Sequence, residues 1–119
     1  MDISLGAIES RFADIIWTHA PLPSSELVTR AQETLGWKKS TTYTVLKRLC
    51  EKGIFENNGG TVAIKLSRED FYTMQSQRFV EETFQGSLPA FLAAFTSGKR
   101  LSPQEVAELR QLVRDHEEG

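Results

Sequence analysis

Residues 40–66 read STTYTVLKRLCEKGIFENNGGTVAIKL, and they carry two different periodicities. Its first half repeats inward-facing residues at the spacing of one helix face, and Gly53 is placed to end that helix as a C-terminal cap. The residues of this face are Thr42, Val45, Leu46 and Leu49. We therefore predict a helix that has Ser40 as its N-cap and stops at Gly53.

The second half of the stretch changes from helical to extended periodicity. Ile54 and Phe55 are β-prone, and residues 61–66 alternate Val, Ile and Leu with other residues. Between these segments, residues 57–60 read NNGG, which is a strong signal for a hairpin turn. A β-hairpin is therefore expected directly behind the helix.

Two further helical patterns precede this stretch. Residues 5–17 repeat apolar side chains at spacings of three and four until prolines interrupt the chain. Residues 24–35 follow, with the hydroxyls of Ser24-Ser25 as N-terminal caps and Gly36 as the stop. Three helices followed by a hairpin predict a winged helix-turn-helix domain over residues 1–66.

The remaining residues, 67–119, predict three more helices. The first opens at Ser67 and runs to Gly86, and the second is short. The third opens at Ser102 with a capping-box glutamate and runs to about His116. The fold class is therefore mainly α with a small β-hairpin: a winged helix-turn-helix domain followed by a helical region.

The helical region over residues 67–119 is expected to form a homodimer. A winged domain of this size leaves little surface on which three amphipathic helices could bury four phenylalanines. A second copy can cover them, because a two-fold interface lets identical apolar faces meet; the alternative is that the helices fold back on their own domain. The candidate dimerisation residues are Phe79, Phe84, Leu88, Phe91, Leu92, Phe95, Val106, Leu109, Leu112 and Val113.

The charge distribution points to a polyanion in spite of an acidic total. The chain has a net charge of −2 and an isoelectric point near 5.7, which argues against nucleic acid at first sight. Five cations nevertheless fall within residues 38–52, opposed only by Glu51, and a polyanion responds to the local potential. These cations are Lys38, Lys39, Lys47, Arg48 and Lys52.

The exposed face of the predicted helix has the composition of a major-groove reader. We expect phosphate contacts from Lys38, Lys39, Ser40 and Arg48, and base contacts from Thr41, Tyr43, Thr44 and Lys47. Two alternatives stay open: the cations form an ordinary solvated face, and Tyr43 is a half-buried packing residue. The hairpin would form a weak wing, with Lys65 as its only cation and the backbone amides of Asn58, Gly59 and Gly60 as phosphate donors.

The sequence contains no pattern typical of a metal site, a cofactor site or an enzyme active site. His19, His116 and the single Cys50 are scattered, so we expect no metal site, no cofactor and no enzymatic activity. No apolar run is long enough to cross a bilayer, and the N-terminus has no signal-peptide pattern. We therefore expect a soluble, cytoplasmic protein without membrane insertion.

Residues 41–49, TTYTVLKRL, followed by Lys52-Gly53-Ile54, resemble the recognition-helix signature of the penicillinase-repressor family. That family includes repressors of β-lactamase and methicillin-resistance genes and copper-responsive repressors. Ile15-Ile16-Trp17 is similar to the end of the family's first helix, and Gly86-Ser87-Leu88 with the segment 91–95 is similar to its dimerisation segment. The resemblance covers nearly the whole chain.

The resemblance implies a dimeric repressor on a palindromic operator, released when a sensor-linked protease cuts near Ala94-Phe95. The staphylococcal-type members have Asn before that Phe, where this chain has Ala94, and many members carry arginines around the wing turn that this chain lacks. Copper-responsive members carry cysteine pairs near the C-terminus, which are absent here. The resemblance is therefore closer to the β-lactamase and methicillin-resistance branch.

Taken together, these features predict a repressor that binds an operator in double-stranded DNA as a homodimer and controls β-lactamase-type or related resistance or stress genes. The alternative is a winged-helix protein-interaction adaptor without DNA binding, for which the acidic total is the main support. A metal-responsive regulator is a third class, which predicts a stoichiometric bound ion.

Overall fold

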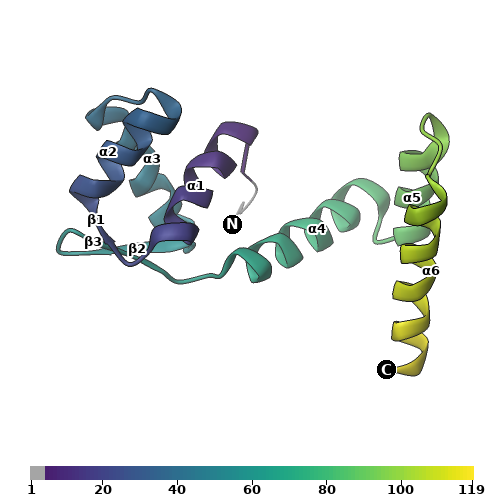
Figure 1. Cartoon of the computed structure of the whole chain (residues 1–119). Coiled ribbons are helices and arrows are strands. Elements are labelled where there is room, and N and C mark those ends of the chain that lie inside the picture. Colours follow the sequence, from purple (N-terminus) through teal and green to yellow (C-terminus); the bar gives the residue numbers. More distant parts are fainter. Residues whose placement is uncertain (1–4) are drawn as a thin grey trace. The chain divides into compact units, whose positions relative to one another are not determined.

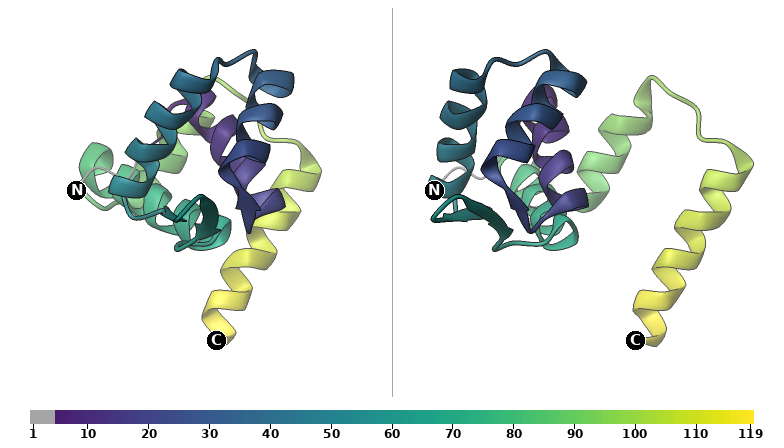
Figure 2. Two further views of the ribbon diagram at one scale, coloured as in Figure 1. Left: turned by 90° about the vertical axis from the view of Figure 1, so that its left-hand side faces the viewer. Right: turned by 60° about the vertical axis from the view of Figure 1, so that its left-hand side comes forward.

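Helices α1 (Ala7–His19), α2 (Ser24–Leu35) and α3 (Lys39–Glu51) form the helix-turn-helix part of the fold. The structure is a computed structural model that describes residues 5–119. The turn between α2 and α3 is short, and Gly36 in it adopts a φ of +69°, which favours glycine. The three helices lie together in both views of Figure 2.

The start of α3 differs from the prediction. Lys38 is the N-cap, its side chain makes no capping hydrogen bond, and Ser40 lies inside the first turn, so the prediction that Ser40 caps this helix is wrong. The reason lies in the preceding residue. The Trp37 N–H donates to the Ala31 carbonyl at 3.4 Å and its ring centroid lies 4.9 Å from that of Phe12, so the chain enters the helix directly after this anchor.

Three short strands form an antiparallel sheet in the order β1-β3-β2. They are β1 (Leu22–Pro23), β2 (Phe55–Asn58) and β3 (Thr61–Ile64). The predicted hairpin is confirmed: Asn58 pairs with Thr61, and Gly59 and Gly60 form the turn with φ values of +60° and +98°. Strand β1 was not predicted, because Pro21 and Pro23 were interpreted as helix breakers, although an edge strand tolerates proline.

One apolar core joins α1, α2, α3 and the sheet. The core residues are Phe12, Ala13, Ile16, Trp17, Leu22, Leu27, Ala31, Val45, Leu46, Leu49, Ile54, Phe55, Val62 and Phe71. Each large side chain that becomes fully buried contributes about 1.5–3 kcal/mol to folding. The predicted inner face of α3 is confirmed, and the buried Thr42 completes it with a hydroxyl that donates to the Lys38 carbonyl at 3.1 Å.

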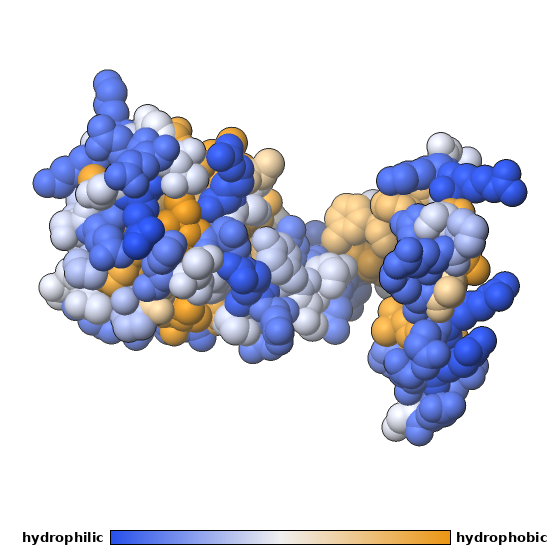
Figure 3. Space-filling model, viewed as in Figure 1, coloured by the Kyte–Doolittle hydropathy of each residue, from blue (hydrophilic) through white to orange (hydrophobic). Residues whose placement is uncertain are grey.

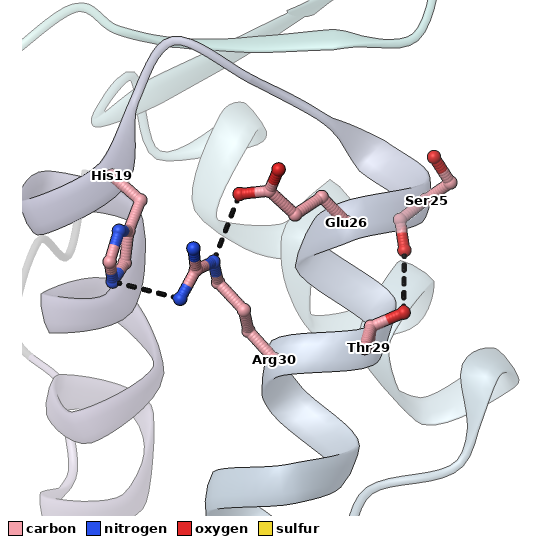
Figure 4. Close-up of polar contacts among 5 residues, drawn as sticks. All are labelled: His19, Ser25, Glu26, Thr29 and Arg30. Carbon is pink, nitrogen blue, oxygen red and sulfur yellow. Dashed lines mark hydrogen bonds and ion pairs between the residues drawn. The ribbon is translucent and has the colours of Figure 1, made fainter.

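Polar contacts connect α1 with α2 outside this core (Figure 4). Arg30 Nε donates to Glu26 Oε2 at 2.9 Å, and Arg30 Nη1 lies 3.3 Å from His19 Nε2. Because a guanidinium only donates, His19 Nε2 is the acceptor in this arrangement. In the same part of α2, Thr29 Oγ1 donates to the Ser25 carbonyl at 3.3 Å.

Helix α4 (Arg68–Phe84) begins in the first of two compact units, which ends at Ser76. Its Phe71 is buried, with the ring centroid 5.4 Å from that of Trp17, whose Nε1 donates to the Leu66 carbonyl at 3.0 Å. The first turns of α4 therefore complete the core of the first unit. The functional division at residue 66 stays a prediction.

The second compact unit, Gln77–Gly119, contains the end of α4 together with α5 (Leu88–Ser97) and α6 (Pro103–Glu118). Ser87 Oγ caps α5 by accepting from the Ala90 N–H, and Ser102 and Glu105 form the predicted capping box of α6. Helix α6 ends two residues later than expected. The six helices and the small sheet within residues 5–119 confirm the predicted fold class. None of the helices between Leu5 and Gly119 is both long and apolar enough to span a membrane.

Candidate nucleic-acid interface

The side of α3 turned away from the core carries most of the predicted DNA-contact residues. Its exposed side chains are those of Lys38, Lys39, Ser40, Thr41, Thr44, Lys47 and Arg48, which we call the α3 surface. Val45 and Leu49 anchor the opposite side in the core. The α3 surface therefore presents hydroxyls and cations together, which is the chemistry that phosphate oxygens and base edges accept.

Thr44 is oriented by its own helix. Its Oγ1 donates to the Ser40 carbonyl at 2.9 Å, so the hydroxyl proton is already used. The oxygen lone pairs and the methyl group remain for a ligand. Such a group can accept a hydrogen bond from the exocyclic amine of a base, or contact a thymine methyl.

Tyr43 lies beside the α3 surface and is half-buried. Its hydroxyl donates to Ser24 Oγ at 3.1 Å, a contact between α3 and the first residue of α2. Its ring packs against the core. In this arrangement the hydroxyl proton is directed into the protein, which favours the packing alternative for Tyr43 over a base contact.

Arg48 is paired with a carboxylate of α1. Its Nη1 lies 3.1 Å from Glu9 Oε2, with side chains 52% and 22% exposed. An ion pair this open to solvent contributes about 0–1 kcal/mol, so a phosphate can compete for the guanidinium. The Glu9 carboxylate therefore reduces the positive potential at this end of the α3 surface.

Some hydrogen-bond donors of the wing turn, residues 57–60, are already bonded to neighbouring side chains. The Gly60 N–H donates to Asn57 Oδ1 at 3.0 Å, and Asn58 Nδ2 donates to Glu56 Oε1 at 3.1 Å. The exposed Lys65 follows β3. The Gly60 amide, one of the three expected phosphate donors, is thus engaged within the turn.

The predicted dimerisation residues are all at least partly exposed in the single chain. Phe84, Phe91, Leu92, Val106 and Leu109 are half-buried, whereas Phe79, Leu88, Phe95, Leu112 and Val113 are between 49% and 58% exposed. The phenylalanine rings form a connected cluster, with centroids 5.5 Å apart for Phe84 and Phe91 and 6.0 Å apart for Phe91 and Phe95. Apolar atoms of this unit are visible at its surface in Figure 3.

Helices α5 and α6 line one apolar groove of about 580 Å³. Its walls are formed mainly by Phe91, Leu92, Phe95, Leu101, Leu109 and Leu112, with Glu105 and Glu108 among the lining residues. A contiguous exposed apolar surface of this kind is typical of an interface with another molecule.

The residues of the expected cleavage site lie within α5. Ala94 and Phe95 are both exposed, and Lys99 Nζ lies 5.9 Å from the centroid of the Phe95 ring. Because the bond between them is helical, a protease that binds extended peptide must unwind α5 to reach it.

Cys50 is partly buried next to β2. Burial raises the pKa of its thiol above the ordinary value, the Glu56 and Glu51 carboxylates add to this effect, and Lys65 offsets part of it. The thiolate is the reactive form, so this cysteine is a poor nucleophile. Over residues 5–119, no group of three or more His, Cys, Asp or Glu side chains is arranged to hold a metal ion.

Two residues of this region were not recognised from the sequence. Glu9 was one of two carboxylates on the predicted first helix, and nothing in the pattern pairs it with Arg48. Ser24 was interpreted as a cap, but Pro23 occupies that position, and the Ser24 side chain contacts α3 instead. Both are contacts between side chains of different helices, 19 and 39 residues apart, which periodicity does not encode.

The chain matches known proteins over almost its whole length. A family model described as "Penicillinase repressor" matches residues 5–115. A protein named "Penicillinase repressor" from Bacillus licheniformis is 26% identical over 106 residues, covering 86% of this chain and 83% of that protein. "Methicillin resistance regulatory protein MecI" from Mammaliicoccus sciuri and from Staphylococcus aureus (strain N315) is 20% identical over 113 residues, covering 92% of each chain.

Proposed function

The chain belongs to the penicillinase repressor family, and on this premise we propose that it represses transcription by binding an operator in double-stranded DNA as a homodimer. The observation that carries the proposal is the α3 surface, where seven hydroxyl or cationic side chains lie exposed on the second helix of a helix-turn-helix. In such motifs the second helix enters the major groove.

We assign two roles within the α3 surface. Lys38, Lys39 and Ser40 at the start of α3 would anchor phosphates, where the helix dipole and uncapped N–H groups favour an anion. Thr41, Thr44 and Lys47 would approach base edges, and Arg48 would contact the backbone once it leaves Glu9. Asn58, Gly59 and Lys65 would add a weak wing contact, and Gly60 could join them only if its amide leaves Asn57.

Dimerisation through the second unit supplies the second recognition helix. Its apolar side chains are exposed in the single chain, and an apolar helix face of a second copy would cover its groove. A two-fold dimer reads two half-sites about one helical turn apart, so the operator would be palindromic.

The names of the relatives support a proposal for the regulated genes, and the family resemblance supports one for the route of release. We propose control of β-lactamase-type or related resistance genes, since the matched proteins are named for penicillinase and methicillin resistance. A sensor-linked protease would release the operator by cutting near Ala94-Phe95, after local unwinding of α5.

Selection of bound fragments from genomic DNA tests the DNA-binding claim. The purified full chain is expected to retain a small set of fragments, with an affinity that falls steeply with salt in proportion to the phosphates neutralised. The adaptor alternative predicts that no fragment is retained at any salt concentration.

Replacement of Thr44 and Lys47 together by Ala tests the assigned face. Each good base contact contributes about 1–3 kcal/mol, so the double variant should bind the selected fragment at least about tenfold more weakly. Ala substitution of Gln32 and Glu33, exposed polar residues on α2, is the matched control. An affinity within twofold of the unmodified chain would contradict the assignment.

A further inference from the structure

Ser24 lies where three parts of the DNA-binding region meet. It is the first residue of α2 and directly follows β1, the strand that pairs with β3 of the wing. In Figure 1, β1 leads from the sheet into α2. Ser24 therefore lies at the point where the chain passes from the sheet into the helix-turn-helix.

The backbone of Ser24 holds the wing turn. Its N–H donates to the Gly60 carbonyl at 2.7 Å, a short hydrogen bond between α2 and the wing turn. Gly60 is one of the two turn residues, with a φ of +98°. A Cβ at this glycine would come within 4.0 Å of Ser24 Oγ, so wing and helix approach closely here.

The side chain of Ser24 holds α3. Its Oγ accepts the hydrogen bond from the Tyr43 hydroxyl at 3.1 Å, across a separation of 19 residues. Tyr43 directly precedes Thr44 on the α3 surface, so a change in its position moves the exposed face of the helix. One residue thus bonds the wing through its backbone and the recognition helix through its hydroxyl.

We propose that Ser24 is a positioning residue of the DNA-binding region, which fixes α3 and the wing turn at one point so that both meet the same duplex. The role assigned to Ser24 rests on the proposed DNA-binding function, whereas the two hydrogen bonds of Ser24 do not depend on it. If α3 and the wing turn moved independently in the free chain, they would lose conformational entropy on binding to a duplex. Holding them in one arrangement beforehand avoids this cost.

The first test uses the free full-length chain and requires no DNA. In Tyr43→Phe, which removes only the hydroxyl, amide hydrogen exchange measured by NMR should become faster at Ser24 and at the wing residues Gly60 and Thr61. Substitution effects confined to α3 would overturn the proposal. Ser25→Ala is the control, since the neighbouring side chain is exposed and its contact is made by the backbone carbonyl.

The second test measures affinity for a fragment selected from genomic DNA. Ser24→Ala and Tyr43→Phe should each weaken binding by about threefold to tenfold, the value of one hydrogen bond, while Ser24→Thr keeps the hydroxyl and restores binding. The double variant should bind no more weakly than either single one, because both remove the same bond. Equal affinity of Ser24→Ala and Ser25→Ala would overturn the proposal.

The two tests separate the inference from the proposed function. If the unmodified chain binds no fragment, the proposed function fails, and the exchange measurement still decides whether Ser24 couples α3 to the wing. If the unmodified chain binds and the variants bind equally well, only the positioning role fails.

Discussion

The two compact units differ in how far their apolar side chains are exposed to solvent. In the first unit, every core residue from Phe12 to Phe71 is at most 8% exposed. Between Gln77 and Gly119 no residue is buried, and Leu88 and Val113 are 55% and 58% exposed. The first unit encloses its own core, whereas the second unit holds its apolar side chains at the surface.

This difference separates two sources of stability. Apolar area removed from water contributes roughly 25 cal/mol per Å², and the first unit obtains this contribution within a single chain. The second unit obtains most of it only when another apolar surface covers α5 and α6. Stability of the first unit should therefore be independent of protein concentration, and that of the second unit should depend on it.

The largest effect is expected from breaking the core of the first unit. Phe12→Ala removes a fully buried ring and should lower the free energy of unfolding by about 3–5 kcal/mol. Urea unfolding followed by tryptophan fluorescence measures it, because Trp17 and Trp37 both lie in this unit. Ile8→Ala, at a position 51% exposed on the same helix, should cost less than about 1 kcal/mol. Equal losses for the two variants would contradict the assignment of the core.

A charge placed on the surface of α6 should break the second unit's association without disturbing the first unit. Leu112→Glu puts a carboxylate on the apolar groove, and burial of an unpaired charge should weaken dimerisation at least about 100-fold. Sedimentation equilibrium measures the dimer dissociation constant. Ala107→Glu adds the same charge on the polar side of α6 and should leave the constant within a few-fold. An unchanged constant in Leu112→Glu would contradict the proposed interface.

The sequence predicted the helices and the hairpin of the first unit because these elements are encoded locally. The spacing of Val45 and Leu49 and the turn at residues 57–60 each determine one element within a few residues. The α3 surface followed from the same periodicity. The bonds of Ser24 and Glu9 to α3 could not be predicted, since they depend on how separate helices pack.

For the second unit, the capping residues predicted where the helices begin, but nothing in the sequence predicted what covers their apolar faces. Ser87 and Ser102 mark the starts of α5 and α6, and both caps are observed. Periodicity identified the apolar faces of these helices. The sequence of a helix does not show which other surface packs against its apolar face.

A smaller effect on DNA binding is expected at the surface of the first unit. Glu9→Gln removes the carboxylate paired with Arg48 and should free the guanidinium for phosphate, which strengthens DNA binding by about twofold to fivefold. Titration with a selected fragment at low salt measures the change, and added salt should reduce it. Glu33→Gln, an exposed carboxylate of α2, is the charge-matched control. Weaker binding in Glu9→Gln would instead indicate that Glu9 orients Arg48 toward DNA.

The smallest effect concerns the capping box of α6. The Ser102 N–H and hydroxyl lower the pKa of the Glu105 carboxyl, so this contribution to stability is present above the carboxyl's ordinary pKa and is lost as pH falls through its lowered value. Glu105→Gln should therefore melt below the unmodified chain at neutral pH, and the difference should shrink in acid. Circular dichroism at both pH values measures it. A difference that grows in acid would contradict the sign.

The central claim is that two copies, joined through their second units, present two α3 surfaces to one duplex. Native mass spectrometry of the full chain with a selected DNA fragment at low micromolar concentration tests it most directly. We predict a complex of two chains per duplex. A complex of one chain per duplex, or chains that remain unbound, would contradict the claim.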